Sequence, residues 1–310
     1  MSKEFPIVAV TGSSGGGSTI LIKAFQNIFR RERVKAAFIQ GNAFHRYSRQ
    51  DMYIEMDKAK AKGEVLSHFS PKGNHLDKLE SLFFQYAAVG KGEYRHYLHT
   101  ADTAKQFDQE PGTFTPWQKM DPDTDLLLYR GLHGAAIDDD IDIAQYPDLL
   151  IGVVPNVNLE WKRRMFRDTA SRNKTRAEVQ QSILDRMHDY VHHMTPQFSR
   201  THINFQMVPH VDTSDPFVES KEILTDEMSL VIHFQNFPTP DLGTILNHLD
   251  GARMTRQDTL IVRGAEMGLA LEIIILPIIQ KLIAESREVR GITSLPKQRG
   301  IGILDVLEQF

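Results

Sequence analysis

The stretch Phe5-Pro-Ile-Val-Ala-Val-Thr11-Gly12-Ser-Ser-Gly-Gly-Gly17-Ser18-Thr19 decides the fold of this chain. An apolar run rich in β-branched residues enters a glycine-rich turn, and an amphipathic segment follows the turn. A strand, a glycine loop and a helix in this order direct several backbone N–H groups and a helix N-terminus at one anion. We therefore expect residues 12–19 to bind a phosphate group.

The spacing of this turn is Gly-x-x-x-x-Gly-x-Thr, which is the P-loop pattern with Ser18 in the place usually taken by lysine. The predicted phosphate-binding residues are Gly12, Ser13, Ser14, Gly15, Gly16, Gly17, Ser18 and Thr19. The Thr19 hydroxyl stands where a P-loop ligates Mg²⁺. Because the usual lysine contacts the β- and γ-phosphates, the site must obtain its positive charge from another residue.

Two other interpretations of the glycine turn stay open. Gly12, Ser14 and Gly16 also fit Gly-x-Ser-x-Gly, the nucleophile elbow of hydrolases, which would need an acid and a histidine such as Asp212 and His233 as partners. A plain tight turn is the second alternative. The dinucleotide pattern Gly-x-Gly-x-x-Gly does not fit, because no glycine follows Gly12 at the second position.

The composition is that of an ordinary globular protein. The chain has 310 residues, of which 41% are hydrophobic and 25% charged, and its net charge is −4. It has no cysteine, which excludes disulfides, thiol catalysis and thiolate metal sites and is compatible with a reducing cytoplasm. We expect no nucleic-acid partner, because acids balance the basic residues and no aromatic platform lies among them.

The most apolar segment, residues 269–283, is interrupted by Glu272, Pro277 and Gln280. We expect it to be too short for a membrane span and to form a buried core helix kinked at the proline. The N-terminus shows no secretory pattern. These features predict a soluble, cytoplasmic protein without a membrane partner.

Hydrophobic patterning predicts an α/β fold with a largely parallel sheet. Residues 148–154 form a continuous apolar run, which is typical of a strand buried on both faces. Strands are expected at 6–11, 36–40, 126–130 and 148–154. Further extended segments at 202–208, 229–235 and 259–263 are expected to form an antiparallel extension of the sheet. Helices are expected at 18–31, 50–61, 75–88, 158–171, 176–193 and 266–285.

Polar side chains follow the predicted strands. His45, Arg46 and Arg49 come after the second strand, and the carboxyl ends of parallel strands face the ligand in such sheets. A solvated basic loop is the alternative. Arg130 ends the strand at 126–130, where many P-loop enzymes carry an acid that helps to hold Mg²⁺.

The helix predicted at 158–171 carries Arg164, Arg167 and Asp168 on one face, and Glu160 lies one turn before Arg164. Guanidinium groups suit phosphate oxygens, although a solvated helix face with ion pairs is the alternative. His188 and His192 are also one turn apart. An ordinary amphipathic helix explains this pair better than a metal site, because no third ligand accompanies it.

Taken together, these segments resemble phosphoribulokinase, in particular its shorter bacterial type, from residue 5 to about 285. The resemblance is carried by Thr-Gly-Ser-Ser-Gly (11–15), Phe-His-Arg-Tyr (44–47), Pro-Gly-Thr-Phe-Thr-Pro-Trp (111–117), Gly-Leu-His-Gly (131–134), Val-Asn-Leu-Glu-Trp (157–161), Arg-Asp (167–168) and Pro-Gln-Phe-Ser (196–199). It implies ATP-dependent phosphorylation of ribulose 5-phosphate to ribulose 1,5-bisphosphate with Mg²⁺. It also implies a P-loop nucleotide-kinase-like mixed, mostly parallel sheet flanked by helices, and a homo-oligomer.

The chain departs from the family pattern at the expected centre of the chemistry. The second strand of the family ends Glu-Gly-Asp, and its aspartate takes the proton of the sugar hydroxyl; this chain has Gln40-Gly41-Asn42, and an amide cannot accept that proton. The glutamate that binds metal in the family is replaced by Arg130. The family pattern Lys-Ile-x-Arg-Asp reads Arg164-Met-Phe-Arg167-Asp168 here.

The resemblance implies a role for each matching position. The catalytic positions would be Asn42 in place of the base, Arg130 in place of the metal-binding acid, Arg164, Arg167 and Asp168, with Thr19 and Asp168 near the metal. The substrate-binding residues would be His45, Arg49, His99, Arg172 and Arg186. We expect residues 1–286 to form the kinase domain and residues 287–310 a C-terminal tail.

Two hypotheses follow for the function. The first is a phosphoribulokinase-type enzyme whose turnover is impaired by Asn42 and Arg130. The second is a catalytically inactive paralogue that binds nucleotide or sugar phosphate, or pairs with an active kinase subunit. Base catalysis contributes roughly 10²- to 10⁴-fold and a metal several kcal/mol, so losing both would leave a very slow enzyme.

Overall fold

The structure is a computed structural model, and it describes residues 4–13, 17–171, 174–218, 222–236 and 241–292. In these residues the main sheet has eight strands in the order β11-β12-β10-β9-β8-β1-β5-β2. The strands are β1 Ile7–Gly12, β2 Ala36–Gln40, β5 Leu126–Gly131, β8 Leu149–Val154, β9 Ile203–Pro209, β10 Met228–Phe234, β11 Arg253–Arg256 and β12 Thr259–Arg263. Two small ribbons pair β3 Glu93–Tyr94 with β4 Gln118–Lys119 and β6 Ile137–Asp138 with β7 Ile141–Asp142.

The pairing confirms the predicted sheet. Strands β2, β5, β1, β8 and β9 are parallel to their neighbours, whereas β10, β12 and β11 extend the sheet in antiparallel fashion. Strands β5 and β8, which correspond to the strands predicted at 126–130 and 148–154, pair with β1 on either side. The glycine turn therefore lies in the middle of the parallel part, which is where α/β sheets bind ligands.

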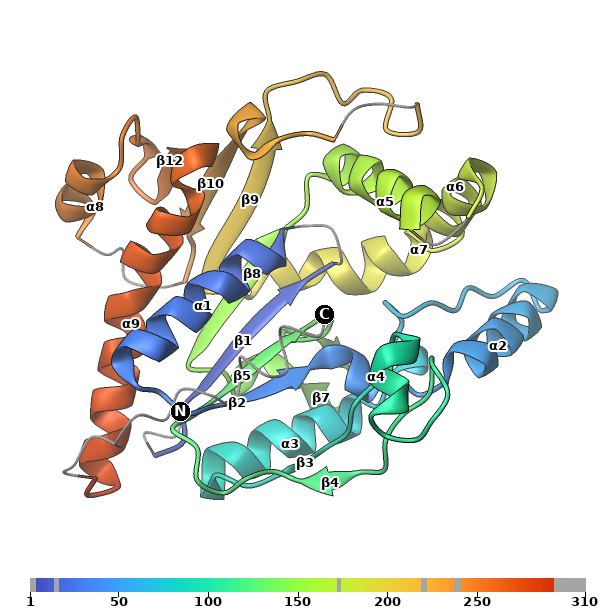
Figure 1. The fold of residues 1–310 in the computed structure, drawn as a ribbon, viewed down its shortest axis with the longest axis horizontal. Coiled ribbons are helices and arrows are strands. Elements are labelled where there is room, and N and C mark those ends of the chain that lie inside the picture. Colours follow the sequence, from blue (N-terminus) through green and yellow to red (C-terminus); the bar gives the residue numbers. More distant parts are fainter. Residues whose placement is uncertain (1–3, 14–16, 172–173, 219–221, 237–240, 293–310) are drawn as a thin grey trace.

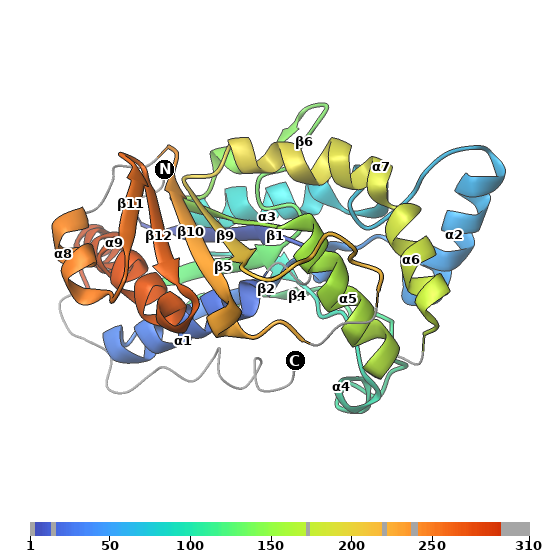
Figure 2. The ribbon, with the colours of Figure 1, turned by 90° about the horizontal axis from the view of Figure 1, so that it is seen from above.

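Helices cover both faces of the sheet (Figures 1 and 2). They are α1 Ser18–Glu32, α2 Arg49–Ala61, α3 Leu76–Val89, α4 Ala101–Lys105, α5 Val157–Ser171, α6 Arg176–Leu184, α7 Met187–Asp189, α8 Leu242–His248 and α9 Met267–Val289. Beyond the carboxyl ends of β1, β2 and β5, α5 and α6 lie on one side and α2 and α4 on the other (Figure 1). This arrangement places the loops after the parallel strands between two groups of helices.

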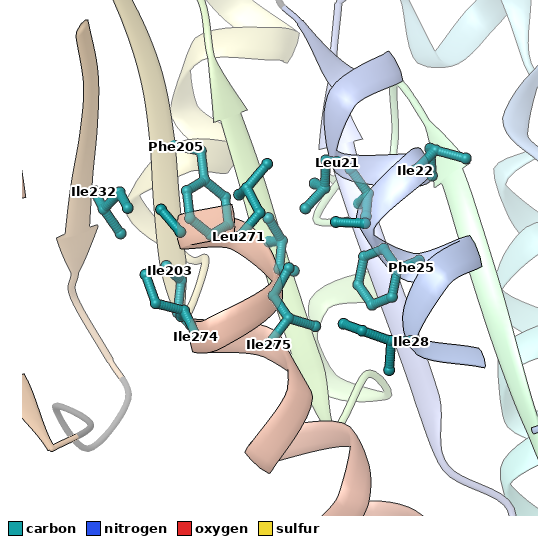
Figure 3. Close-up of a cluster of buried hydrophobic side chains, with 14 of the residues drawn as sticks. Leu21, Ile22, Phe25, Ile28, Ile203, Phe205, Ile232, Leu271, Ile274 and Ile275 are labelled. Atoms are coloured by element: carbon teal, nitrogen blue, oxygen red, sulfur yellow. The ribbon is translucent and has the colours of Figure 1, made fainter. Parts of the chain in front are cut away.

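The alternation of side chains along the strands builds two cores. Val8, Val10 and Leu128 join α1 and α9 in one buried cluster, while Ala9 and Tyr129 join α3 in the other. Figure 3 shows the first core, in which Leu21, Phe25 and Ile28 of α1 face Leu271, Ile274 and Ile275 of α9 beside Ile203 and Phe205 of β9. The two cores hold β1 and β5 rigidly, and these strands carry the candidate site.

The single helix predicted over 176–193 is wrong. Helix α6 ends at Leu184, Arg186 adopts φ −102° and ψ −3°, and a π-helical turn over Tyr190–Met194 follows α7. A π turn widens the helix, and such turns are frequent at functional sites. The interruption leaves the Arg186 side chain beside Asp168, His45 and His68.

The apolar C-terminal helix is longer than predicted. The apolar helical segment Gly264–Val289 has 26 residues, and an 18-residue window within it has a mean hydropathy of 1.9. By length and composition it could cross a membrane, so the argument that it is too short is wrong. Its inward side packs against α1 and the sheet, as a core helix does. The helix takes in residues 287–289 of the predicted tail, and residues 293–310 lie outside the described part of the chain.

Candidate active site

The glycine turn joins β1 to α1 at a point of close backbone approach. A Cβ at Gly12 would lie 2.8 Å from Cβ of Val153 on the neighbouring strand β8, so this position has no room for a side chain. Gly17 caps α1 with φ 102°, a left-handed conformation that glycine adopts readily, and Met207 covers it. Gly12 therefore permits the close approach of β1 and β8, and Gly17 supplies the left-handed conformation at the start of α1.

Arg130 contacts the start of α1. Its Nε and Nη2 donate hydrogen bonds of 3.1 and 2.8 Å to Oγ of Ser18, the residue in the place of the usual P-loop lysine. Burial lowers the pKa of the Arg130 guanidinium, and Ser18 is 6% exposed. In the sequence, the loop lacks its usual lysine and the strand β5 carries an arginine near its end in place of an acid. In the structure, this arginine contacts the residue that stands in the place of the lysine.

Asn42 lies in the turn directly after β2. Its side-chain Nδ2 contacts Nε2 of His99, and its buried Oδ1 makes no hydrogen bond among the described residues. Arg49 donates from Nη2 to the backbone oxygen of His99 at 2.7 Å. Three residues predicted from the resemblance, Asn42, Arg49 and His99, are therefore in one place.

A group of buried imidazoles lies beside Asn42. The rings of His45 and His68 stack with centroids 4.2 Å apart, His45 Nδ1 pairs with Oδ1 of Asn74 at 2.8 Å, and His133 Nε2 pairs with the backbone oxygen of His68 at 3.0 Å. Burial lowers the pKa of His45 and of His133 to about 4. These imidazoles are therefore neutral at pH 7 and present polar atoms without charge.

Arg186 brings a positive charge to the imidazoles. Its Nε is buried without a hydrogen-bond partner among the described residues, and burial lowers the pKa of its guanidinium. An unpaired buried donor of this kind is costly unless a ligand satisfies it. The Arg186 Nε, just after α6, is therefore a candidate donor to an anionic oxygen, and its role in substrate binding stays a prediction.

The predicted charged face of α5 is confirmed. Arg167 Nε donates to Oδ1 of Asp168 at 2.8 Å, and Arg164 Nε lies 3.7 Å from Oδ2 of the same carboxylate. Arg164 also donates to Oγ of Ser182 at 2.9 Å, and burial lowers its pKa to about 10. Asp168 is only 3% exposed, so this face is turned inward and is not a solvated surface.

Glu160 connects α5 to the π-helical turn that begins at Tyr190. Burial raises the pKa of its carboxyl, while the Ser13 hydroxyl and Tyr190, whose hydroxyl donates to Oε2 at 3.2 Å, oppose that rise. Arg164 and Arg167 also act on Glu160. Tyr190 of the π-helical turn and the two arginines of α5 therefore act on the same carboxyl group.

The structure thus gathers most of the predicted residues around the carboxyl ends of the parallel strands. Ser14, Gly15, Gly16 and Arg172 lie outside the described residues. Thr19 is exposed in the first turn of α1. His188 and His192 stack at 4.2 Å, and no group of three possible metal-binding side chains exists in the described part of the chain.

Sequence reasoning missed Arg95, which positions the turn after β2. Its Nε and Nη2 donate to the backbone oxygens of Ala43 and His45 at 2.8 and 2.6 Å, and its guanidinium lies 3.6 Å from the ring centroid of Phe114. Arginine stacked on an aromatic ring is a common support of this kind. His68 was missed because nothing in its local sequence points to the site.

The residues predicted near magnesium offer few oxygen ligands. Mg²⁺ requires oxygen donors in octahedral geometry. The Asp168 carboxylate already pairs with Arg164 and Arg167, and the strand end that could supply an acid carries Arg130. The described residues therefore fit this ion poorly, and metal binding by Thr19 and Asp168 stays a prediction.

A parallel sheet with a glycine turn between β1 and α1, and basic side chains around the carboxyl ends of its strands, defines a kinase of the P-loop type. Residues 7–214 match the model of the phosphoribulokinase / uridine kinase family. The chain belongs to this family.

Relatives with known names support this assignment over nearly the full length. The chain is 46% identical to the chromosomal phosphoribulokinase of Cupriavidus necator over 284 residues, which cover 91% of this chain and 97% of that one. It is also 46% identical to a probable phosphoribulokinase of Escherichia coli, with 91% and 98% covered. The solved phosphoribulokinase of Rhodobacter spheroides superposes with a TM-score of 0.82 at 41% identity, covering 92% of this chain and all of that one.

The family assignment bears on the interpretations left open. It confirms the resemblance and the P-loop nucleotide-kinase-like fold inferred from the motifs. It favours phosphate binding by the glycine turn over a hydrolase elbow, for which Ser14 would be the nucleophile. Asn42 lies directly after β2 and Arg130 near the end of β5, whereas the loss of a base and of a metal-binding acid at these positions stays a prediction.

Proposed function

We propose that this chain binds ATP on the turn at residues 12–19 and a pentose phosphate, ribulose 5-phosphate in the first instance, on the basic and imidazole groups beyond the strands. The sugar phosphate would contact His45, Arg49, His99, Arg167 and Arg186. Neutral imidazoles and guanidinium donors together suit a phosphorylated polyol, because they satisfy both hydroxyl groups and anionic oxygens.

Phosphoryl transfer in this site would be slow. The side chain at the position of the base is the amide of Asn42, whose Nδ2 contacts His99, so no carboxylate receives the proton of the attacking hydroxyl at that point. Phosphoryl transfer through a loose transition state depends least on a base, so slow turnover is compatible with this arrangement. This single substitution carries the proposal of impaired activity.

The residues of the chain would act mainly by binding and orientation. Arg164 and Arg167 bracket Asp168, and Arg186 keeps an unpaired donor beside the imidazoles. Mg²⁺, when bound in kinases of this type, neutralises charge on the transferred phosphate. The chain's own guanidinium groups would place positive charge around the same phosphates.

A catalytically inactive paralogue is the second candidate function, and the same substitutions favour it. Such a protein would keep the affinity for nucleotide or sugar phosphate, or would pair with an active kinase subunit. The homo-oligomer, the cytoplasmic location and the division into residues 1–286 and 287–310 also stay predictions.

The test combines binding and turnover. Calorimetric titration with ATP and with ribulose 5-phosphate should show binding of both ligands, and a coupled assay of ATP consumption over a panel of pentose phosphates should show slow turnover of one of them. Binding without any turnover would establish the inactive paralogue. No heat of binding with any adenine nucleotide would reject the kinase. No binding of ribulose 5-phosphate either would also reject a paralogue that binds these ligands.

A further inference from the structure

The backbone register fixes the direction of the Arg130 side chain. Arg130 pairs with Val10 of β1 and Gln40 of β2, so it lies between the two strands that precede the glycine turn and Asn42. Leu128 on the same strand belongs to the core that contains α1, and Tyr129 belongs to the opposite core. Because side chains alternate along a strand, Arg130 points to the α1 side, as Leu128 does.

The contact with Ser18 holds the guanidinium at the glycine turn. Two N–H groups of Arg130 converge on one oxygen, Oγ of Ser18, in the first residue of α1. An arginine has five N–H donors in a rigid fork, so three remain for a ligand. Ser18 thus tethers a cation at the position from which a P-loop lysine would reach the phosphates.

The charge of Arg130 is not balanced by the protein. No carboxylate of the described residues forms an ion pair with it, and burial is the cause that lowers its pKa. Burying an uncompensated guanidinium is unfavourable, and an anion bound at the glycine turn would remove that cost. Ser18 lies in the first turn of α1, where the backbone N–H groups of a helix N-terminus favour the same anion.

We propose that Arg130, tethered by Ser18, is the phosphate-binding cation of this chain and lets it bind ATP without Mg²⁺. One residue thereby replaces both the lysine of the P-loop and the metal-binding acid at the end of β5. Arginine residues supply such charge to phosphates in other nucleotide-binding enzymes. This inference rests on the proposed nucleotide site and adds how that site obtains its positive charge.

The experiment is calorimetric titration of the full chain with ATP, in EDTA and in excess Mg²⁺. The unchanged protein should bind ATP in EDTA with a Kd within about threefold of the value in Mg²⁺. Arg130→Met should weaken binding in EDTA by about 10- to 100-fold, as expected for loss of a charge-assisted contact. Arg253→Met, on the exposed strand β11, is the matched control and should bind as the unchanged protein does.

Two further variants keep the test decisive. Arg130→Lys preserves the charge and should lose less affinity than Arg130→Met, and circular dichroism and thermal melts identify any variant that fails to fold. Ser18→Ala removes the tether and should weaken binding in EDTA by a smaller factor than Arg130→Met.

The outcomes separate this inference from the proposed function. Binding that requires Mg²⁺ in the unchanged protein, or equal affinity of folded Arg130→Met, would overturn the role of Arg130 while leaving the nucleotide site intact. Absence of ATP binding in both conditions would overturn the nucleotide site and the inference together.

Discussion

Asn42 and His99 are in side-chain contact where β2 ends, although 57 positions separate them in the chain. Arg49 fixes the backbone of His99 by a 2.7 Å hydrogen bond, so the amide and the imidazole are held together from two elements. Relatives named phosphoribulokinase share the fold. The resemblance seen in the sequence implies an aspartate at this place in the family, where this chain has Asn42. The difference between a slow and a fast enzyme would lie in this one side chain.

Asn42→Asp should restore a proton acceptor. We expect the rate of phosphoryl transfer to ribulose 5-phosphate to rise by roughly 10²- to 10⁴-fold, which is the usual contribution of general-base catalysis. The measurement is ADP formation in a coupled assay. Asn247→Asp, an exposed change on α8, is the matched control. An unchanged rate in folded Asn42→Asp would mean that the missing base is not what limits turnover.

Arg186→Met should weaken the binding of sugar phosphate selectively. The guanidinium has a buried Nε without a partner in the described residues, so a bound phosphate oxygen would gain a charge-assisted hydrogen bond. Loss of that bond should raise the Kd for ribulose 5-phosphate by about 10- to 100-fold and leave the Kd for ATP within about twofold. An equal rise in the Kd for ATP and the Kd for ribulose 5-phosphate would contradict a specific contact between Arg186 and the sugar phosphate.

The stability of the protein should depend on pH through its buried histidines. Burial lowers the pKa of His45 and His133 to about 4, whereas an unfolded histidine has a pKa of about 6.5. Below pH 6.5 the unfolded chain therefore takes up protons that the folded chain does not. The free energy of unfolding should fall by about 1.4 kcal/mol per pH unit for each histidine until about pH 4.

Urea denaturation between pH 5 and 8 checks this dependence. The free energy of unfolding should be flat above about pH 7 and should fall toward pH 5. His133→Gln removes one buried imidazole. The free energy of unfolding of this variant should therefore fall less steeply with decreasing pH, whatever its value at pH 8. A slope that stays the same in this variant would contradict the assignment to His133.

Gly12→Ala tests the packing under the glycine turn. A Cβ at this position would lie 2.8 Å from Cβ and 2.9 Å from the backbone oxygen of Val153, so β1 and β8 would have to move apart. We expect a loss of about 1–3 kcal/mol in the free energy of unfolding, as for other overpacked sites. Gly268→Ala in α9, where a Cβ would meet nothing within 4 Å, is the control and should not destabilise the fold.

Much of the fold could be predicted from the sequence because local patterns agree with the tertiary structure. The strands β1, β2, β5 and β8 each follow from a short apolar run, and the glycine turn marks their shared ligand edge. The break at Arg186 was not predicted, because residues 176–193 contain no glycine or proline that would mark the end of a helix.

The candidate site was predictable in part. Motifs identified Asn42, His99 and Arg186, each beside a strand or helix end. The pairing of Arg130 with Ser18 spans 112 positions and depends on the register of β5 against β1, which single-sequence patterns do not give. The alternation of Leu128 and Tyr129 between the two cores could have indicated the side on which Arg130 lies.

The central claim is that this chain binds its ligands but transfers the phosphoryl group slowly. The most direct test is the rate of ADP formation from ATP and ribulose 5-phosphate in the presence of Mg²⁺. The 46% identical phosphoribulokinase of Cupriavidus necator is measured under the same conditions. The structure predicts a rate at least about 100-fold lower for this chain, because the base is absent at Asn42. A rate within tenfold of the relative would contradict the account.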